Sequence, residues 1–175
     1  MTASLTIATD GSTSQSRRGG HSGWAWVSST GVYSSGNAAT GSILLAELTA
    51  IEAALRWALR GPGRSRHVVI LTDSQPARHL IEKLRQHAVI TVPAGTAGHR
   101  EIARTARHIA ELIRSNPSST ITLTWVRGHN GHPLNEAADR IARQSRISGA
   151  MPSAAQAALY AQIAHDATRT WRHAA

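Results

Sequence analysis

The sequence predicts an α/β domain built around a five-stranded mixed sheet. Three short apolar runs with brief connections open the chain, which is the pattern of an antiparallel meander. Helical and strand-length patterns alternate after them, and strands that are joined through helices pair in parallel. At 175 residues the chain is long enough for one domain with a full hydrophobic core.

The three strands of the meander are predicted to be short. Residues 4–9 alternate apolar and polar side chains, which is the period of a strand with one buried face, and residues 10–12 stop the apolar pattern. A second strand is expected at residues 24–28, and a third opens at Gly31 and runs through Tyr33. This assignment places Asp10 just beyond the end of the first strand.

A helix is predicted over residues 43–60, because apolar side chains recur there at three- and four-residue spacing. At about 100° per residue, Glu47 lies about 40° from Ile51 and therefore flanks the apolar stripe. Glu52 lies about 140° from Glu47 and is expected to face water. A carboxylate at the edge of a buried face needs a cation or a metal ion as its partner.

The later elements alternate strands and helices. Residues 67–72 contain a continuous apolar run, typical of a central strand covered on both faces, and this strand ends at Asp73. A short helix through Leu84 is expected next, and residues 88–98 are loop-like. The domain is then completed by a helix over residues 100–114, a strand over 121–126 and a helix over 133–146.

The C-terminal part of the chain is predicted to add one more helix. Residues 148–152 are linker-like, and residues 153–173 are rich in alanine, with a stripe at helical spacing formed by Tyr160, Ala164, Ala167 and Trp171. We expect this helix to dock the stripe onto the domain. Self-association or substrate binding is the alternative.

Composition narrows the class of protein. Nineteen Lys and Arg residues against ten Asp and Glu residues give a formal net charge of +9, and Lys83 is the only lysine. This excess favours an anionic partner, nucleic acid first, with a solvated basic surface as the alternative. The chain has no cysteine, which excludes disulfides and cysteine-based zinc sites. No secretory signal or membrane-spanning run is recognised, so we expect a cytoplasmic protein without membrane contact.

Four carboxylates are candidate metal ligands. Asp10 and Asp73 follow two predicted strands, and they converge at one edge of the sheet if those strands are adjacent and parallel. Each alone could be a turn residue or a helix cap, and Glu47 or Asp139 alone could pair with an arginine. Together, in a basic chain without cysteine, they suit hard cations such as Mg²⁺. Two such ions about 3.5–4 Å apart clamp the reacting oxygens of a phosphoryl transfer.

Residues 125–139 join the last predicted strand to its helix through a loop that carries two histidines. Histidine is suited to proton transfer near neutral pH, which makes His129 a candidate proton carrier, with a surface loop residue as the alternative. His132 and Asn135 are expected to shape the loop rather than to act in chemistry.

At these residues the sequence resembles the type 1 ribonuclease H family. The resemblance covers roughly residues 4–146 and rests on four motifs in order: Thr9-Asp10-Gly11-Ser12, Ala46-Glu47-Leu48, Thr72-Asp73-Ser74-Gln75, and Gly128-His129-Asn-Gly-His132-Pro133 followed by Asn135-Glu136 and Asp139. It implies a ribonuclease H-like fold over residues 1–147, with residues 148–175 as a linker and helical extension. It also implies an endonuclease that cuts the RNA strand of RNA–DNA hybrids with two Mg²⁺ ions, for which Mn²⁺ is a substitute.

The resemblance implies a role for each site residue. Asp10 would bridge the two ions, Asp139 would hold the ion that activates water, and Glu47 and Asp73 would hold the ion on the leaving-group side. Glu47 would also lie near a ribose 2′-hydroxyl, and His129 would assist proton transfer or product release. The residues expected to contact the hybrid are Gly11, Ser12, Ser42, Gln75 and Asn135.

The chain departs from the family pattern in three places. Residues 14–20 replace the usual Asn-Pro-Gly run, and residues 42–45 replace an Asn-rich segment before Glu47. Residues 86–98 lack the basic, Trp-bearing handle of many members. We therefore expect weaker or differently distributed binding, compensated by Arg17, Arg18 or the C-terminal helix.

Two other functions remain open at this point, and we expect a monomer in each case. One is another nuclease of the same superfold, such as a junction resolvase or a polymerase-linked nuclease, because a fold alone does not define a function. The other is a non-catalytic module that binds hybrid or double-stranded RNA. Retention of all four carboxylates argues against the second, because a mere binder of polyanions gains nothing from them.

Overall fold

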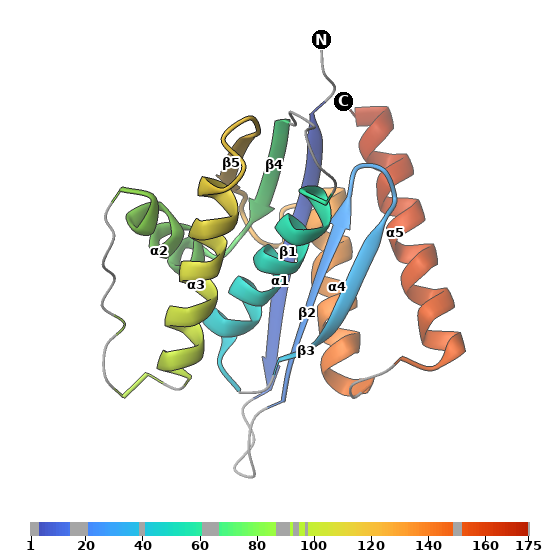
Figure 1. The fold of residues 1–175 in the computed structure, drawn as a ribbon. Coiled ribbons are helices and arrows are strands. Elements are labelled where there is room, and N and C mark those ends of the chain that lie inside the picture. The colour runs from blue at the N-terminus through green and yellow to red at the C-terminus, as the bar shows by residue number, and fades with distance from the viewer. Residues whose placement is uncertain are drawn as a thin grey trace.

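The computed structural model describes residues 4–14, 21–38, 41–60, 67–86, 92, 95–96, 98–148 and 152–174. A five-stranded sheet lies at its centre, in the order β3-β2-β1-β4-β5 (Figure 1). The strands are β1 Leu5–Ser14, β2 His21–Ser28, β3 Tyr33–Ala38, β4 His67–Thr72 and β5 Thr120–Trp125. β1, β2 and β3 pair antiparallel, whereas β4 and β5 run parallel to β1, which confirms the predicted mixed sheet.

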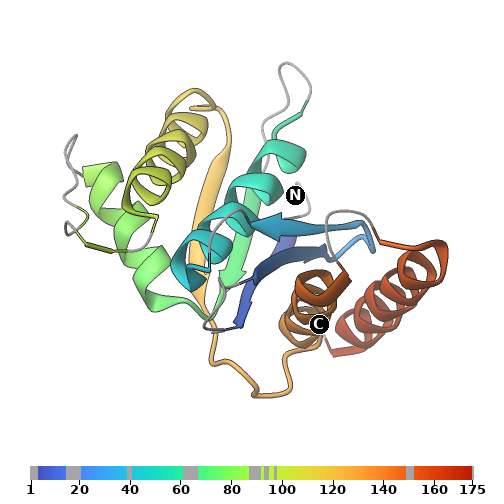
Figure 2. The same ribbon diagram turned by 90° about the horizontal axis from the view of Figure 1, so that it is seen from below.

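Helices cover both faces of the sheet (Figure 2). One face carries α1 Ile43–Ala58, α2 Gln75–Gln86 and α3 His99–Arg114, and the other carries α4 Pro133–Ser148 and α5 Ala154–Ala174. Successive side chains of β1 point to opposite faces of the sheet. Ile7 therefore belongs to the core under α1, and Ala8 belongs to the core under α4. The sequence order of strands and helices is therefore as predicted.

β1 is longer than its apolar pattern indicates. The expectation that it ends at residue 9, with Asp10 beyond it, is wrong, because Asp10 pairs with Ala25 of β2 and the antiparallel ladder continues to Ser14. Parallel pairing with β4, by contrast, stops at Thr9 and Thr72. The apolar pattern of β1 ends where its pairing with β4 ends. Its pairing with β2 continues through polar residues, because polar side chains do not prevent backbone pairing.

The third strand is also displaced from its prediction. β3 begins at Tyr33 and runs to Ala38, beyond the expected end. Its residues are mostly small and polar, and apolar alternation therefore gave no signal for it. Trp24 of β2 fills the space beside Gly36, where a Cβ atom would lie 2.8 Å from the indole ring.

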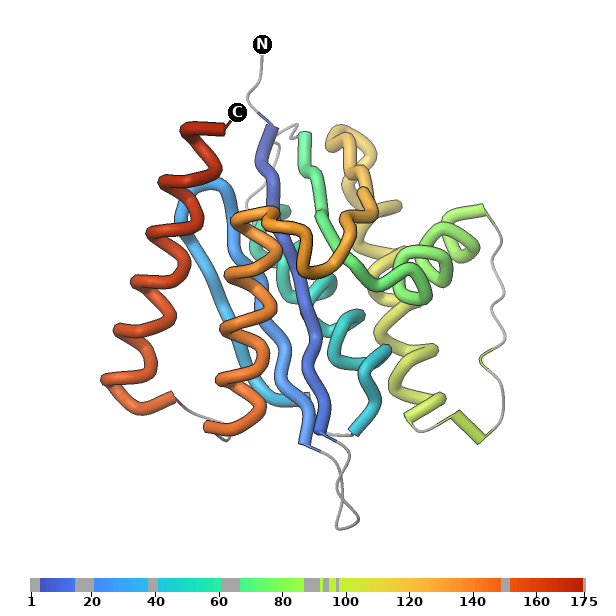
Figure 3. The backbone as a smooth tube through the Cα atoms, turned by 180° about the vertical axis from the view of Figure 1, so that it is seen from behind, coloured from blue at the N-terminus to red at the C-terminus, as the bar shows by residue number. Residues whose placement is uncertain are grey.

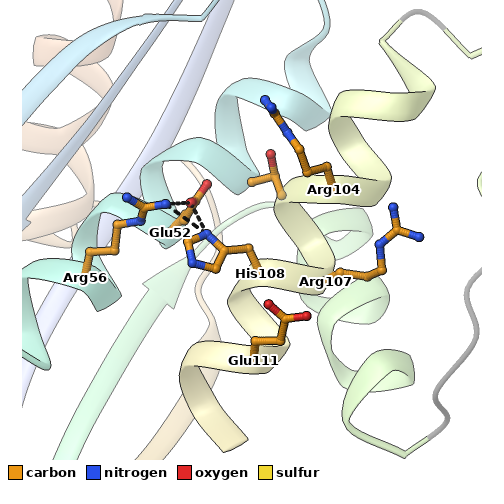
Figure 4. Close-up of a pocket in the computed structure, with 7 residues that line it drawn as sticks. Glu52, Arg56, Arg104, Arg107, His108 and Glu111 are labelled. Carbon is orange, nitrogen blue, oxygen red and sulfur yellow. Dashed lines mark hydrogen bonds and ion pairs between the residues drawn. The ribbon is translucent and has the colours of Figure 1, made fainter. Parts of the chain in front are cut away.

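Glu52 joins α1 to α3 instead of facing water, so that expectation is wrong. Its Oε1 atom lies 2.7 Å from Nη2 of Arg56 and 2.6 Å from Nδ1 of His108, and its side chain is only 17% exposed (Figure 4). The periodicity of α1 shows which side chains face the sheet, but it contains no information about a second helix. α3 packs along this side of α1 and encloses the carboxylate.

α5 docks onto the domain, as the favoured interpretation of its stripe predicted. Tyr160, Ala164 and Ala167 are buried in the core that α4 and the sheet share. The Tyr33 hydroxyl donates a hydrogen bond to the Ala157 carbonyl (3.0 Å), which attaches the helix to β3. No helix among the described residues combines the length and the apolar character that crossing a membrane requires.

Candidate active site

Four carboxylates from four elements meet in one cleft where the pairing of β1 with β4 ends. β1 supplies Asp10, the residue after β4 is Asp73, α1 supplies Glu47 and α4 supplies Asp139. Oxygen atoms of Asp10, Glu47 and Asp73 lie within 4.8 Å of one another. The cleft is lined by these four residues together with Gly11, Ser12, Thr13, Ile43, His129, Arg143 and Arg146.

Glycines allow the elements to approach closely enough for this convergence. A Cβ atom on Gly11 would lie 2.7 Å from the backbone nitrogen of Glu47, so α1 rests directly on the β1 backbone beside Asp10. A Cβ atom on Gly128 would lie 2.7 Å from Oδ2 of Asp73. A Cβ atom on Gly23 would likewise collide with the carbonyl oxygen of Ala142, so α4 rests directly on the β2 backbone. The Asp-Gly pair in β1 therefore has a packing reason as well as a chemical one.

The carboxylates of Asp10 and Glu47 are destabilised in their charged forms. Both residues are only 5% exposed. Burial, then the charges of Asp73 and Asp139, raise the pKa of Asp10 to about 8. Burial, then the charges of Asp10 and Asp73, likewise raise the pKa of Glu47 well above its usual range. A hydrogen bond from the Gly11 backbone opposes both shifts without cancelling them.

This cluster fits divalent metal ions. Oε2 of Glu47 is buried and has no hydrogen-bond partner among the described residues, and such an acceptor is costly unless something binds it. The neighbouring ligand atoms are carboxylate oxygens, which hard cations prefer. A bound cation would satisfy the unpaired oxygen and offset the mutual repulsion that raises the two pKa values.

The loop of residues 126–132 runs from the end of β5, beside Asp73, to the start of α4, the helix that carries Asp139, and is visible from behind in Figure 3. At its first end the Trp125 indole donates a hydrogen bond to the Asp73 carbonyl (3.1 Å), and the Val126 amide donates to the Thr72 carbonyl (3.0 Å). His129 is exposed at the cleft, with a positive φ of 52°. We call residues 126–132 the histidine loop.

Arg143 is a cleft residue that the sequence interpretation missed. Its Nε donates to Oδ1 of Asp139 (2.8 Å), and its Nη2 lies 3.4 Å from Nε2 of His129. The four-residue spacing of Asp139 and Arg143 on one helix was a usable signal. Arg146, whose Nε donates to Oγ of Ser12 (3.1 Å), joins residues far apart in the chain and left no local signal.

The predicted substrate contacts lie in different environments. Gly11 and Ser12 line the cleft, whereas Ser42, Gln75 and Asn135 are not among its lining residues. Ser42 caps α1, accepting a hydrogen bond from the Leu45 amide (3.4 Å), and Gln75 is exposed at the start of α2. Asn135 is only 2% exposed, which favours its loop-shaping role over contact with a substrate.

The possible replacements for a basic handle are described only in part. Arg17 and Arg18 lie outside the described residues, as does most of the stretch from 87 to 97. The C-terminal helix is described, and it packs on α4, one of the helices that line the cleft.

Comparison with known proteins shows the family of the chain. A family model described as RNase H matches residues 2–147. "Ribonuclease H" of Tropheryma whipplei (strain Twist) is 32% identical over 141 residues, covering 81% of this chain and 83% of that protein. "Ribonuclease H" of Oleidesulfovibrio alaskensis is 34% identical over 91 residues, covering 52% of this chain and 58% of that protein.

Solved structures share the fold at lower identity. RNase H1 from Halobacterium salinarum NRC-1 superposes with a TM-score of 0.59 at 20% identity, covering 84% of this chain and all of that one. A foamy viral protease-reverse transcriptase in complex with an RNA/DNA hybrid gives 0.65 at 18% identity, covering 83% of this chain and 20% of that one.

Proposed function

The chain belongs to the RNase H family and is a ribonuclease H, and from this premise we propose that it cuts the RNA strand of RNA–DNA hybrids as a metal-dependent endonuclease. The observation that carries the proposal is the clustering of Asp10 and Asp73 around Glu47, whose buried Oε2 has no partner among the described residues, with Asp139 lining the same cleft. The foamy viral neighbour, bound to an RNA/DNA hybrid, supports the choice of substrate.

Asp10, Glu47, Asp73 and Asp139 would hold two Mg²⁺ ions, with Mn²⁺ as a substitute. Bound ions would supply an activated water and stabilise the negative charge that develops on the phosphate. Asp10 would share in holding both ions, because its carboxylate lies close enough to those of Asp73 and Asp139 to be repelled by both. Asp139 is held by an ion pair with Arg143, which also lines the cleft and would attract a phosphate group there.

His129 would carry the proton. It is exposed on a loop and lines the cleft that holds the carboxylates, a position from which an imidazole would exchange protons between the cleft and solvent. Glu47 near the ribose 2′-hydroxyl would distinguish RNA from DNA. Gly11 and Ser12 line the cleft, and their backbone would read the minor groove. Ser42 and Gln75 would contact the hybrid from outside the cleft lining, whereas buried Asn135 would contact it only if its loop-shaping role allows. Binding measurements on alanine variants test each contact.

Cleavage of four labelled substrates tests the proposal: RNA–DNA hybrid, RNA duplex, DNA duplex and single-stranded RNA, each with Mg²⁺ and with EDTA. We expect Mg²⁺-dependent cutting of the hybrid alone. Cutting of DNA duplex would instead favour a resolvase-like nuclease, and binding without cutting by folded protein would favour a non-catalytic module. A cytoplasmic location and a monomeric state complete the proposal, and light scattering of the purified protein tests the second.

A further inference from the structure

We propose that α5 positions the histidine loop through Trp171, whose indole packs against the imidazole of His132. The ring centroids of the two side chains are 5.0 Å apart, with the planes tilted by 36°. α5 lies beyond residues 2–147, which the family model covers, so Trp171 lies outside the matched region. The inference rests on the proposed function for its kinetic test but not for its structural one.

His132 is the N-terminal cap of α4. Its Nδ1 accepts a hydrogen bond from the Asn135 amide (3.4 Å), and its carbonyl accepts from the Glu136 amide (3.0 Å). An imidazole can accept in this way only with a lone pair on Nδ1, which requires its neutral form. Burial lowers the pKa of His132, in agreement with that role. The residue on which Trp171 packs therefore starts the helix that carries Asp139 and Arg143.

Among the described residues, the other contacts of the histidine loop lie mostly at the surface: Nη2 of Arg143, whose side chain is 52% exposed, lies 3.4 Å from Nε2 of His129. At its first end Trp125 and Val126 hold it to the backbone around Asp73. Residues 129–131 are exposed, and a hydrogen bond from the Gly131 amide to Oε1 of Glu136 (3.3 Å) is a surface contact. The exposed tip therefore lies between the strand end held by Trp125 and Val126 and the helix start at His132, with Arg143 beside His129. Loosening His132 would change where His129 stands.

α5 is attached to the domain close to Trp171. One turn before Trp171, the Thr168 hydroxyl donates to the Ser28 carbonyl (3.3 Å) at the end of β2, and Thr168 is buried. Ala164 and Ala167 are buried in the core that α5 shares with α4 and the sheet. Figure 3 shows the C-terminal end of α5 beside the beginning of α4. Trp171 therefore projects from an anchored helix onto the cap residue.

The inference is tested in the full chain with Trp171→Ala, Trp171→Phe and a matched control, Leu159→Ala. Leu159 lies on the same helix but is 45% exposed. Trp171→Ala should lower kcat for hybrid cleavage on the order of tenfold, because small displacements of catalytic groups are expensive, with KM within about twofold. Trp171→Phe keeps an aromatic ring and should restore most of kcat. Leu159→Ala should match the wild type.

Amide hydrogen exchange gives a readout that does not depend on activity. Trp171→Ala should speed exchange in the histidine loop and the first turn of α4, while β1, β4 and α1 keep their protection. If Trp171→Ala does not fold, Trp171→Leu keeps an apolar cover without the ring and should show the same loop-specific loss.

The results distinguish a failure of the proposed function from a failure of the positioning role of Trp171. Wild-type protein that cuts no hybrid defeats the proposed function, while loop exchange still tests the positioning role. An active wild type with unchanged kcat and unchanged loop exchange in Trp171→Ala overturns the inference. Uniformly faster exchange over the whole domain, without rescue of kcat by Trp171→Phe, also overturns it, since Trp171 would then only cover the core.

Discussion

At the residue scale, Asp10 and Glu47 set the energetics of the site. Both are buried, and both have raised pKa values because burial and neighbouring carboxylates oppose their charged forms. Groups with strongly perturbed pKa values in a cleft are characteristic of functional sites rather than of stabilising ones. The cluster therefore favours metal binding at the expense of the stability of the metal-free protein.

The stability of the metal-free protein should fall as pH rises. Asp10 has an ordinary pKa of 3.8 when unfolded and about 8 when folded, so the folded state binds its proton more tightly. The resulting stability is complete below about pH 4 and is lost as pH rises through about 8. Each unit of pKa difference corresponds to about 1.4 kcal/mol, so a difference of about four units corresponds to a loss of several kcal/mol.

Urea unfolding in EDTA across this pH range measures the effect. Asp10→Asn is neutral at every pH and should flatten most of the decline, with Glu47 accounting for the remainder. An equal decline in wild type and Asp10→Asn would show that Asp10 is not the titrating group. The same variant should lose turnover, because an amide is a poor ligand for a hard cation.

Arg143→Ala should affect activity more than stability. Arg143 is 52% exposed, and its ion pair with Asp139 is worth less than about 1 kcal/mol. It nevertheless fixes Asp139 and contacts His129, so we expect kcat for hybrid to fall on the order of tenfold. Arg140→Ala, at an exposed position on the same helix outside the cleft, is the control. Equal rates for the two variants would remove Arg143 from the site.

At the scale of elements, the site depends on how closely helices approach strands. Gly11 lets α1 rest on β1, and Gly128 lets the histidine loop rest on Asp73. Sequence patterns predicted the type and order of these elements, because apolar periodicity records which side faces a neighbour. They did not predict the end of β1 or the enclosure of Glu52, because both depend on a second element that each segment's own periodicity does not record.

Removal of α5 should destabilise the domain. Truncation after Ser148 exposes the face of α4 on which α5 packs and deletes the buried side chains of Tyr160 and Ile163. Burial of one large apolar side chain contributes about 1.5–3 kcal/mol, so a loss of several kcal/mol is expected in urea unfolding. An unchanged unfolding midpoint together with unchanged hybrid affinity would leave the helix without a role.

At the scale of the whole molecule, the sequence predicted the residues that line the site but not the long-range contacts that hold them in place. The four carboxylates and His129 were identified because each stands in a short motif, and the structure brings them into one cleft. The contacts that hold them, such as Arg146 with Ser12 and Trp171 with His132, join distant segments. Such pairs carry no local pattern, so only the fold reveals them.

The net charge of +9 should appear in the salt dependence of binding. Each phosphate contact adds about 0.9 to the slope of log affinity against log salt concentration, so a slope of several is expected for hybrid binding by inactive Asp10→Asn. Fluorescence anisotropy over a range of NaCl concentrations measures it. Affinity that does not change with salt would show that the arginines face solvent instead of phosphate.

The most direct measurement is the initial rate of cleavage of a hybrid labelled on both strands, with wild type and Asp10→Asn, over a range of Mg²⁺ concentrations. We predict cleavage of the RNA strand only, a rate of zero without metal, and loss of turnover in a folded Asp10→Asn. Metal-independent cleavage, cleavage of the DNA strand, or appreciable turnover by Asp10→Asn would contradict a metal-dependent ribonuclease centred on Asp10.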